Sequence, residues 1–196
     1  MIAVINIVIY AISYINPTLY NYIYHYCGLS VLAIDKYHFY WQFLTYMFVH
    51  GNLEHVILNM LCFICFGISI ERAIGSKEFL LFYFLCGILS GALSYLVYKF
   101  TNNYYVILIG ASGAVYSILF AYAVFFPRSI IYLWWVIPVP APVMVILYTI
   151  IELGSQLFYR NSGIAHLTHL FGFLTAYLYF VIRMGIHPIK VWKGLK

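Results

Sequence analysis

The sequence predicts an all-α, polytopic membrane protein with six transmembrane helices in one compact domain. Its 196 residues are 65% hydrophobic and only 8% charged, whereas charged residues make up about 25% of an ordinary soluble domain. The 21% aromatic content, mostly Tyr and Phe, is typical of side chains at membrane–water interfaces. No polar linker is long enough to separate two domains, so residues 1–196 are predicted to form a single membrane domain.

Hydrophobic runs long enough to cross about 30 Å of hydrocarbon define the predicted spans. They cover residues 2–22, 53–71, 79–99, 113–127, 142–159 and 165–184. The first run has no basic segment before it, so we expect a retained span rather than a cleaved signal peptide. Residues 25–52 mix polar and apolar side chains and predict a long interfacial loop with short helices. The proline- and tryptophan-containing stretch SIIYLWWVIPVPAP is typical of a connection at the membrane surface.

The basic residues predict an orientation with both termini in the cytoplasm. Six crossings then leave Lys36, Lys99 and Arg160 outside, and the positive-inside rule is obeyed. The basic residues at the cytoplasmic ends are Arg72, Lys77, Arg128, Arg183, Lys190, Lys193 and Lys196. Topology therefore accounts for the net charge of +5, and we expect the lipid bilayer, and no nucleic acid, as a partner.

In this orientation, polar side chains gather at the outer ends of three predicted spans. His55 and Asn59 lie in the first two turns of the second span, Ser112 heads the fourth, and His166 and His169 begin the sixth. A helix rises about 1.5 Å per residue, which puts them within several Å of one level. Polar groups inside a membrane are costly and mark functional sites by default. The alternative for any one of them is a hydrogen bond that fixes helix packing.

The fourth span is short for a membrane crossing. Residues 113–126 make about 21 Å of helix against a core of about 30 Å. With Arg128 at its inner end, this helix is expected to begin below the outer surface. Irregular backbone at that depth is tolerated only where protein surrounds it or water reaches it. Both conditions suit a hydrolase.

The residue types at this level suit acyl transfer. Ser112 is the candidate nucleophile, since a serine hydroxyl needs only an adjacent base such as histidine. Gly110 and Gly113 allow a tight turn and close approach of a substrate. The Ser112 N–H at a helix start is a candidate oxyanion donor, as are His55 and Asn59, which share a helix face.

Two further side chains bear on the histidine. Tyr116, four residues after Ser112, could pack against the imidazole. Glu152 is the only carboxylate well inside a predicted span. It either orients a group near the site or, as we expect, hydrogen-bonds between helices. With no acidic partner evident, the residues predict a Ser–His dyad. Cys62 and Cys65 form a CxxC inside an apolar helix without neighbouring ligands, so no metal or redox role is expected.

Four motifs resemble those of the rhomboid intramembrane serine proteases, in their residues and in their order along the chain. HGNLEHVILN resembles the second-span motif, at His50, His55 and Asn59. GASGAVY resembles the G-x-S-G nucleophile motif with its following tyrosine, AHLTHLFGFLTA the sixth-span histidine motif, and IERAIGS the turn after span two. The resemblance covers nearly the whole chain and implies the compact rhomboid-like bundle in its minimal six-helix, bacterial-type form.

The resemblance implies a role for each residue. Ser112 is the nucleophile and His169 the base, because this choice places Gly172 at the family's glycine; His166 is then a supporting or packing residue. His55, Asn59 and the Ser112 N–H form the oxyanion hole. His50 braces the loop above the site and Tyr116 stacks on His169. Gly110 and Gly113 support the nucleophile.

The implied activity is that of a serine endopeptidase, a hydrolase that cuts transmembrane protein substrates in or near their spans without a cofactor or metal. The active site would open to the outer side of what we expect to be a prokaryotic inner membrane. Gln42 stands where the family usually has an arginine, a departure that concerns the anchoring of the first loop and not catalysis. Ala176 stands where a second small residue is expected. The main alternative is a catalytically inactive rhomboid-like protein that binds membrane clients. A histidine-relay transporter would predict internal repeats, and a metalloprotease an H-E-x-x-H motif; the sequence has neither.

Overall fold

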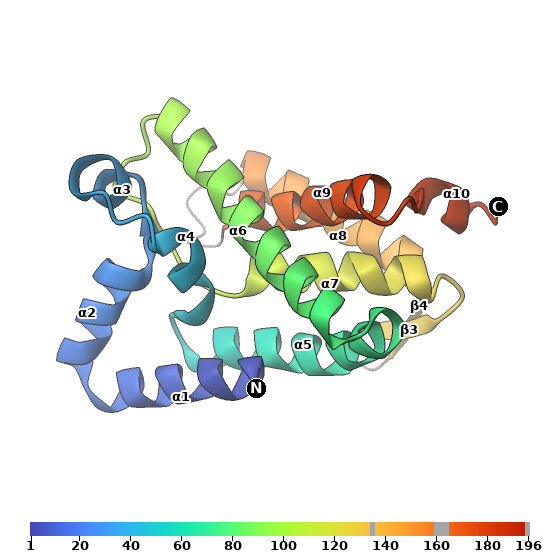
Figure 1. The fold of residues 1–196 in the computed structure, drawn as a ribbon, viewed down its shortest axis with the longest axis horizontal. Helices are drawn as coiled ribbons and strands as arrows, with labels where there is room; N and C mark the ends of the chain where they lie inside the picture. The colour runs from blue at the N-terminus through green and yellow to red at the C-terminus, as the bar shows by residue number, and fades with distance from the viewer. Residues whose placement is uncertain (134–135, 159–164, 195–196) are drawn as a thin grey trace.

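The computed structural model describes residues 1–133, 136–158 and 165–194, and within them the chain is mostly helical (Figure 1). Arg160 and Lys196, which entered the charge count, and Tyr159 at the end of the fifth predicted span lie outside the described residues. The first half contains α1 (Ile2–Ile15), α2 (Pro17–Cys27), α3 (Val31–Tyr37), α4 (Gln42–Thr45), a 3-10 turn (Tyr46–Phe48), α5 (Leu53–Ile74) and α6 (Ser76–Phe100). The second half contains α7 (Ser112–Phe125), α8 (Ala141–Phe158), α9 (His166–Ile182) and α10 (Pro188–Trp192).

Two short antiparallel strand pairs correct the expectation of a purely α-helical chain. β1 (Leu29–Ser30) pairs with β2 (Ile107–Leu108) and ties the first loop to the segment that enters α7. β3 (Ile130–Leu133) pairs with β4 (Ile137–Pro140), within the proline-rich connection between α7 and α8. Both pairs lie in connections, where backbone groups outside helices need partners.

The first predicted span, residues 2–22, is wrong as one continuous helix. α1 ends at Ile15, Asn16 adopts an extended conformation, and α2 starts at Pro17. Proline has no N–H for the preceding helix and disfavours helical backbone in the residue before it. The Asn16 side chain accepts a hydrogen bond from the Leu19 N–H and caps the new helix.

The first loop contains the short helices expected within residues 25–52, and Gln42 anchors it. The buried Gln42 amide accepts a hydrogen bond from the Ser30 N–H at 3.1 Å and donates to the carbonyl oxygens of His25 and Tyr26 at 3.1 and 3.2 Å. Three backbone groups are thus satisfied by one neutral side chain. In this chain, glutamine fixes the loop at the position where an arginine was expected.

The helix lengths fit a polytopic membrane protein. Among the described helices, α5, α6 and α8 are each long and apolar enough to cross a membrane. The apolar helices α1, α7 and α9 are shorter, with 14, 14 and 17 residues. Six crossings therefore remain a prediction, while α7 has the shortness that the sequence indicated.

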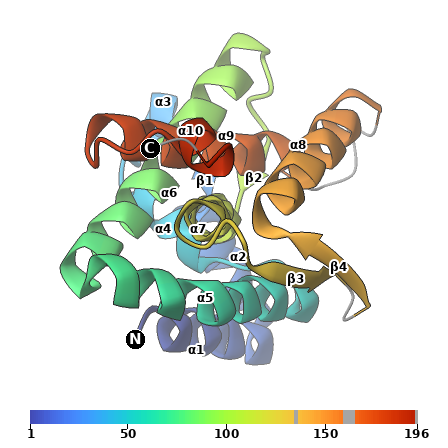
Figure 2. The same cartoon turned by 90° about the vertical axis from the view of Figure 1, so that its right-hand side faces the viewer.

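Helix α7 forms the centre of the bundle. Figure 2 looks along it and shows α5, α6, α8 and α9 around it, and α7 contacts each of these four helices. Most of its side chains are buried, on every side of the helix, as expected for a helix that is apolar all round. Its first residue, Ser112, is therefore placed inside the protein rather than at its surface.

Candidate active site

The backbone immediately before α7 packs closely against the His55 side chain. Gly110 has φ of +112°, a conformation that residues with a side chain rarely adopt. A Cβ atom on Gly110 would lie 2.6 Å from Nε2 of His55. The lack of a side chain at Gly110 thus lets the first turn of α5 approach the residues that lead into Ser112. Ser112 itself is buried, with 7% of its surface exposed.

The second-span residues border the same turn. The Ala111 N–H donates to Nε2 of His50 at 3.5 Å, and the His50 and His55 rings meet edge to face with centroids 5.0 Å apart. The Asn59 amide donates to the His55 carbonyl oxygen at 2.8 Å. His50, in the loop before α5, is buried, and burial together with the nearby His55 lowers the pKa of its imidazole well below its ordinary value. A neutral ring can accept the Ala111 hydrogen bond.

Asn52 is a supporting residue that the sequence analysis did not single out. Its side-chain oxygen accepts a hydrogen bond from the His55 N–H at 2.8 Å and caps α5. An asparagine directly before a helical run is a recognisable N-cap signal. The cap fixes the start of α5, and with it the position of His55.

Two glycines bring α9 against the start of α7. A Cβ atom on Gly172 would lie 2.3 Å from the carbonyl oxygen of Gly113, so the two helices touch backbone to backbone. One turn earlier on α9, the Thr168 side chain lies against Gly113. His169, the next residue, is therefore level with the head of α7. The contact is strengthened by Ser117, which donates to the Gly172 carbonyl oxygen at 2.8 Å.

The His169 imidazole stacks on Tyr116 of α7. The ring centroids are 4.2 Å apart and the planes differ by 12°. His169 is buried, with 9% of its surface exposed. An offset or parallel stack of this kind restricts the rotation of the imidazole and excludes water from one face.

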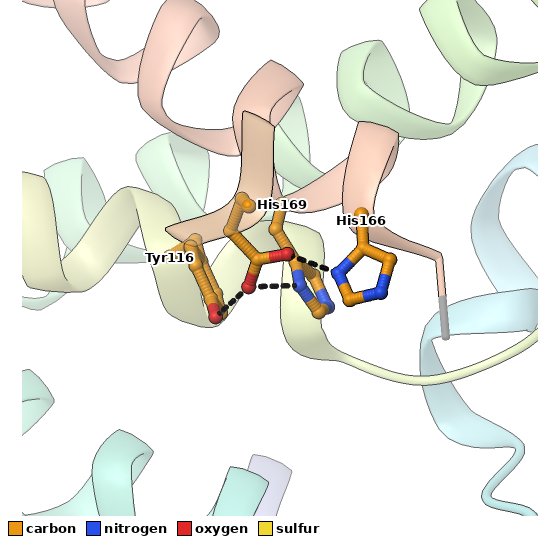
Figure 3. Close-up of polar contacts among 4 residues, drawn as sticks. Tyr116, His166 and His169 are labelled. Atoms are coloured by element: carbon orange, nitrogen blue, oxygen red, sulfur yellow. Dashed lines mark hydrogen bonds and ion pairs between the residues drawn. The ribbon is translucent and has the colours of Figure 1, made fainter. Parts of the chain in front are cut away.

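A single carboxylate from α8 holds both histidines of α9 (Figure 3). Oε1 of Glu152 lies 2.9 Å from Nδ1 of His169, and Oε2 lies 2.5 Å from Nδ1 of His166. The Tyr116 hydroxyl also donates to Oε1. Glu152 therefore hydrogen-bonds between helices, as expected, but the expectation that the histidine lacks an acidic partner is wrong.

The sequence carried little sign of this cluster. Glu152 precedes the two histidines by 14 and 17 residues and belongs to another helix, so no spacing rule joins them. The one available signal was that a carboxylate inside an apolar run needs a partner, because an unpaired buried charge is costly. Which partner it finds depends on how α8 packs against α9.

The geometry can support acid–base chemistry at His169. A neutral imidazole that donates its Nδ1 proton to a carboxylate presents Nε2 as the proton acceptor. Glu152, His166 and His169 also form a set of three side chains with one ligand atom each, all within 4.8 Å of one another, that could hold a metal ion.

Fold and site together define a class: a polytopic helical membrane protein whose central helix begins at a buried serine. A histidine of α5 packs against Gly110 just before this serine, and a histidine of α9 stacks on Tyr116 one turn after it. The chain belongs to the rhomboid family, since the Rhomboid domain model matches residues 37–185.

Several proteins with rhomboid names are similar in sequence to this chain. RHOMBOID-like protein 4 of Arabidopsis thaliana is 30% identical over 164 residues, which cover 82% of this chain and 38% of the relative. Rhomboid-related protein 1 of Caenorhabditis elegans is 30% identical over 169 residues, covering 80% and 44%. The putative rhomboid protease YdcA of Bacillus subtilis is 25% identical over 140 residues, covering 70% and 64%. The chain thus spans less than half the length of the first two relatives.

Proposed function

We propose that this chain is an intramembrane serine endopeptidase that hydrolyses peptide bonds in or near transmembrane segments of other membrane proteins. Membership of a family that includes rhomboid proteases supports this activity. The observation that carries the proposal is the backbone contact between Gly113 and Gly172. It joins the helix that begins with Ser112 to the helix that carries His169, one residue from Ser112 and one turn from His169.

In the proposed reaction, Ser112 is the nucleophile and His169 the general base. Nε2 of His169 takes the hydroxyl proton as Oγ of Ser112 attacks the scissile carbonyl carbon. The imidazolium then gives this proton to the leaving amine as the peptide C–N bond breaks. Water attacks the acyl-enzyme in the second half, its proton again passing through His169, and releases the carboxylic acid and the serine.

The oxyanion of each tetrahedral intermediate would be stabilised by the Ser112 N–H and by the side chains of His55 and Asn59. The first is a backbone donor at the start of α7, and the other two lie on the first turns of α5. Preorganised donors in a protein interior stabilise developing charge more strongly than water does. His50 supports the turn through its hydrogen bond with the Ala111 N–H.

A fluorophosphonate probe and a cleavage assay test this function together. Wild-type protein in detergent micelles should be labelled and should cut a transmembrane model peptide, with products read by mass spectrometry. Ser112→Ala and His169→Ala should lose both signals yet remain folded. A wild-type protein that takes no label and cuts no member of a peptide panel would instead support a client-binding, inactive relative.

The choice of base is tested by His166→Ala. This variant should keep measurable cleavage, whereas His169→Ala should not. The reverse result would make His166 the base.

The orientation also belongs to the proposal. Both termini would lie in the cytoplasm of a prokaryotic cell and the site would open toward the outer side of its inner membrane. Reporter fusions at the two ends of α6 should report the cytoplasm near Lys77 and the outside near Lys99; the opposite pattern would refute this topology.

A further inference from the structure

We propose that Glu152 is a positioning residue for His169, so that this chain operates as a Ser–His–Glu system rather than as a Ser–His dyad. The inference rests on the proposed peptidase function. Glu152 would hold the imidazole with its proton on Nδ1 and would stabilise the positive charge that His169 acquires when it takes the Ser112 proton.

The carboxylate is fixed from three directions. Glu152 projects from α8, and its Oε1 accepts hydrogen bonds from Nδ1 of His169 and from the Tyr116 hydroxyl of α7. Oε2 is held by His166, one turn before His169 on α9. Both carboxylate oxygens are engaged, so the group cannot rotate without breaking hydrogen bonds. Its orientation toward His169 is therefore set by the protein (Figure 3).

Burial strengthens the effect that the Glu152 carboxylate has on His169. Only 5% of the Glu152 surface is exposed, and the two histidines are buried beside it. Interactions between charges are stronger in such an interior than in water. A buried carboxylate is tolerated where it is paired and hydrogen-bonded, and here its partners include the ring that must become charged during the reaction. The same contact thus satisfies Glu152 in the resting protein and stabilises the charge on His169 in the transition state.

Tyr116 and Glu152 restrict the imidazole in complementary ways. The Tyr116 ring lies flat against the His169 ring, which limits tilting, while the hydrogen bond between Nδ1 and Glu152 opposes a flip of the ring about its Cβ–Cγ bond. Together they fix which nitrogen is directed away from the carboxylate. That nitrogen, Nε2, is the atom the proposed base requires.

The distances favour this reading over a metal site. Ligands at about 2.0–2.1 Å from a tetrahedral zinc ion lie about 3.3 Å from one another. Here Glu152 lies 2.9 Å from His169 and 2.5 Å from His166, which are hydrogen-bond separations. Each histidine therefore bonds directly to the Glu152 carboxylate.

Charge and size can be separated at position 152. Glu152→Gln keeps the length of the side chain and an oxygen that can accept the Nδ1 proton, but it removes the charge. Glu152→Asp keeps the charge and loses one methylene. A positioning residue that acts through its charge predicts higher kcat for Asp than for Gln; a group that only fills space and packs helices predicts the opposite order.

The experiment measures kcat and KM for a transmembrane peptide, the rate of fluorophosphonate labelling, and thermal unfolding in micelles. Glu152→Gln should lower kcat by about 10²–10⁴-fold and slow labelling, with KM within about threefold of wild type. The kcat of Glu152→Asp should be at least tenfold higher than that of Glu152→Gln. The control is Thr149→Val, one turn earlier on α8, where the hydroxyl donates to the Val145 carbonyl oxygen of the same helix; it should leave kcat and KM unchanged.

The outcomes are distinct. A folded Glu152→Gln protein with wild-type kcat, or an Asp variant slower than Gln, overturns the role of Glu152 while the peptidase function stands. If Glu152→Gln does not fold, Glu152→Asp decides: activity with wild-type KM supports the role, and a folded, inactive protein overturns it. Loss of wild-type activity in EDTA that Zn²⁺ restores assigns the cluster to a metal and overturns it. Wild-type protein without labelling or cleavage overturns both proposals.

Discussion

Gly172 of α9 and Gly113 of α7 lie so close that a Cβ atom on Gly172 would be 2.3 Å from the Gly113 carbonyl oxygen. The obstacle is backbone of the central helix, which cannot turn aside as a side chain can. This contact sets the separation of the two helices that carry Ser112 and His169. The position of the proposed base relative to the proposed nucleophile therefore depends directly on packing at this contact.

We expect Gly172→Ala to destabilise the protein by about 1–3 kcal/mol, the usual cost of overpacking, and to lower cleavage by moving α9 away from α7. Gly154→Ala is the matched control, because a Cβ atom there meets nothing within 4 Å. Alanine at an open helical site should leave stability unchanged or raise it by up to about 1 kcal/mol. Unfolding in micelles measures both, and equal effects of the two variants would contradict the packing argument.

Gly110→Ala should lower kcat per folded enzyme, so that the loss of activity exceeds what the loss of stability accounts for. The backbone there has φ of +112°, and the added methyl group would meet Nε2 of His55 at 2.6 Å. Gly75 also has a positive φ, of +83°, but a Cβ atom there meets nothing. Gly75→Ala should therefore show backbone strain with normal kcat. Comparable kcat losses in the two variants, measured per folded enzyme, would count against a specific role for the Gly110–His55 contact.

Substitutions of Tyr116 should separate stacking from hydrogen bonding. Tyr116→Phe keeps the ring that lies 4.2 Å from His169 and removes the hydroxyl that donates to Glu152. Tyr116→Leu removes both. Because each interaction contributes about 1 kcal/mol, we expect about a fivefold loss of kcat for Phe and about 30-fold for Leu. A Leu variant as active as the Phe variant would show that stacking does not position the histidine.

Asn59→Ala should lower kcat by about 10–1,000-fold, with little change in KM, because one oxyanion donor among several is removed. The control is Asn52→Ala, which removes the cap of the same helix. It should cost about 1 kcal/mol of stability and lower kcat per folded molecule less than Asn59→Ala does, because it removes no oxyanion donor. Steady-state kinetics on both variants makes the comparison; unchanged kcat in Asn59→Ala would exclude Asn59 from the oxyanion hole.

His50 should make stability depend on pH. Burial lowers its pKa in the folded protein, so His50 stays neutral there while the unfolded chain binds a proton below about pH 6.5. Acid therefore favours the unfolded chain, and stability falls as pH drops from about 6.5 toward the lower pKa of the folded state, by up to about 1.4 kcal/mol per pH unit. His50→Gln should show a shallower decline between pH 7 and 5; parallel curves would refute the assignment.

Much of the fold could be predicted because the signal is local. The starts and ends of α5, α6, α8 and α9 lie within a few residues of the predicted spans, since apolar runs of helical length are visible in any window of the sequence. The prediction of one continuous first span was wrong at Pro17. The run is mostly apolar, but the missing proline N–H interrupts the helix. The β1–β2 pair was not predicted because pairing of Leu29 with Leu108 joins residues far apart in the chain. The β3–β4 pair is a local hairpin within the proline-rich stretch that was interpreted only as a surface connection.

The sequence alone determined that this is an apolar, helical membrane protein of the rhomboid type, with serine, histidine and asparagine near the starts of three helices. These properties follow from composition, hydropathy and motif order, which need no neighbours in space. Only the tertiary structure decided that Glu152 accepts hydrogen bonds from Tyr116, His166 and His169. A hydrogen bond between helices depends on their rotation and separation, and these are set by close packing at contacts such as Gly113 with Gly172.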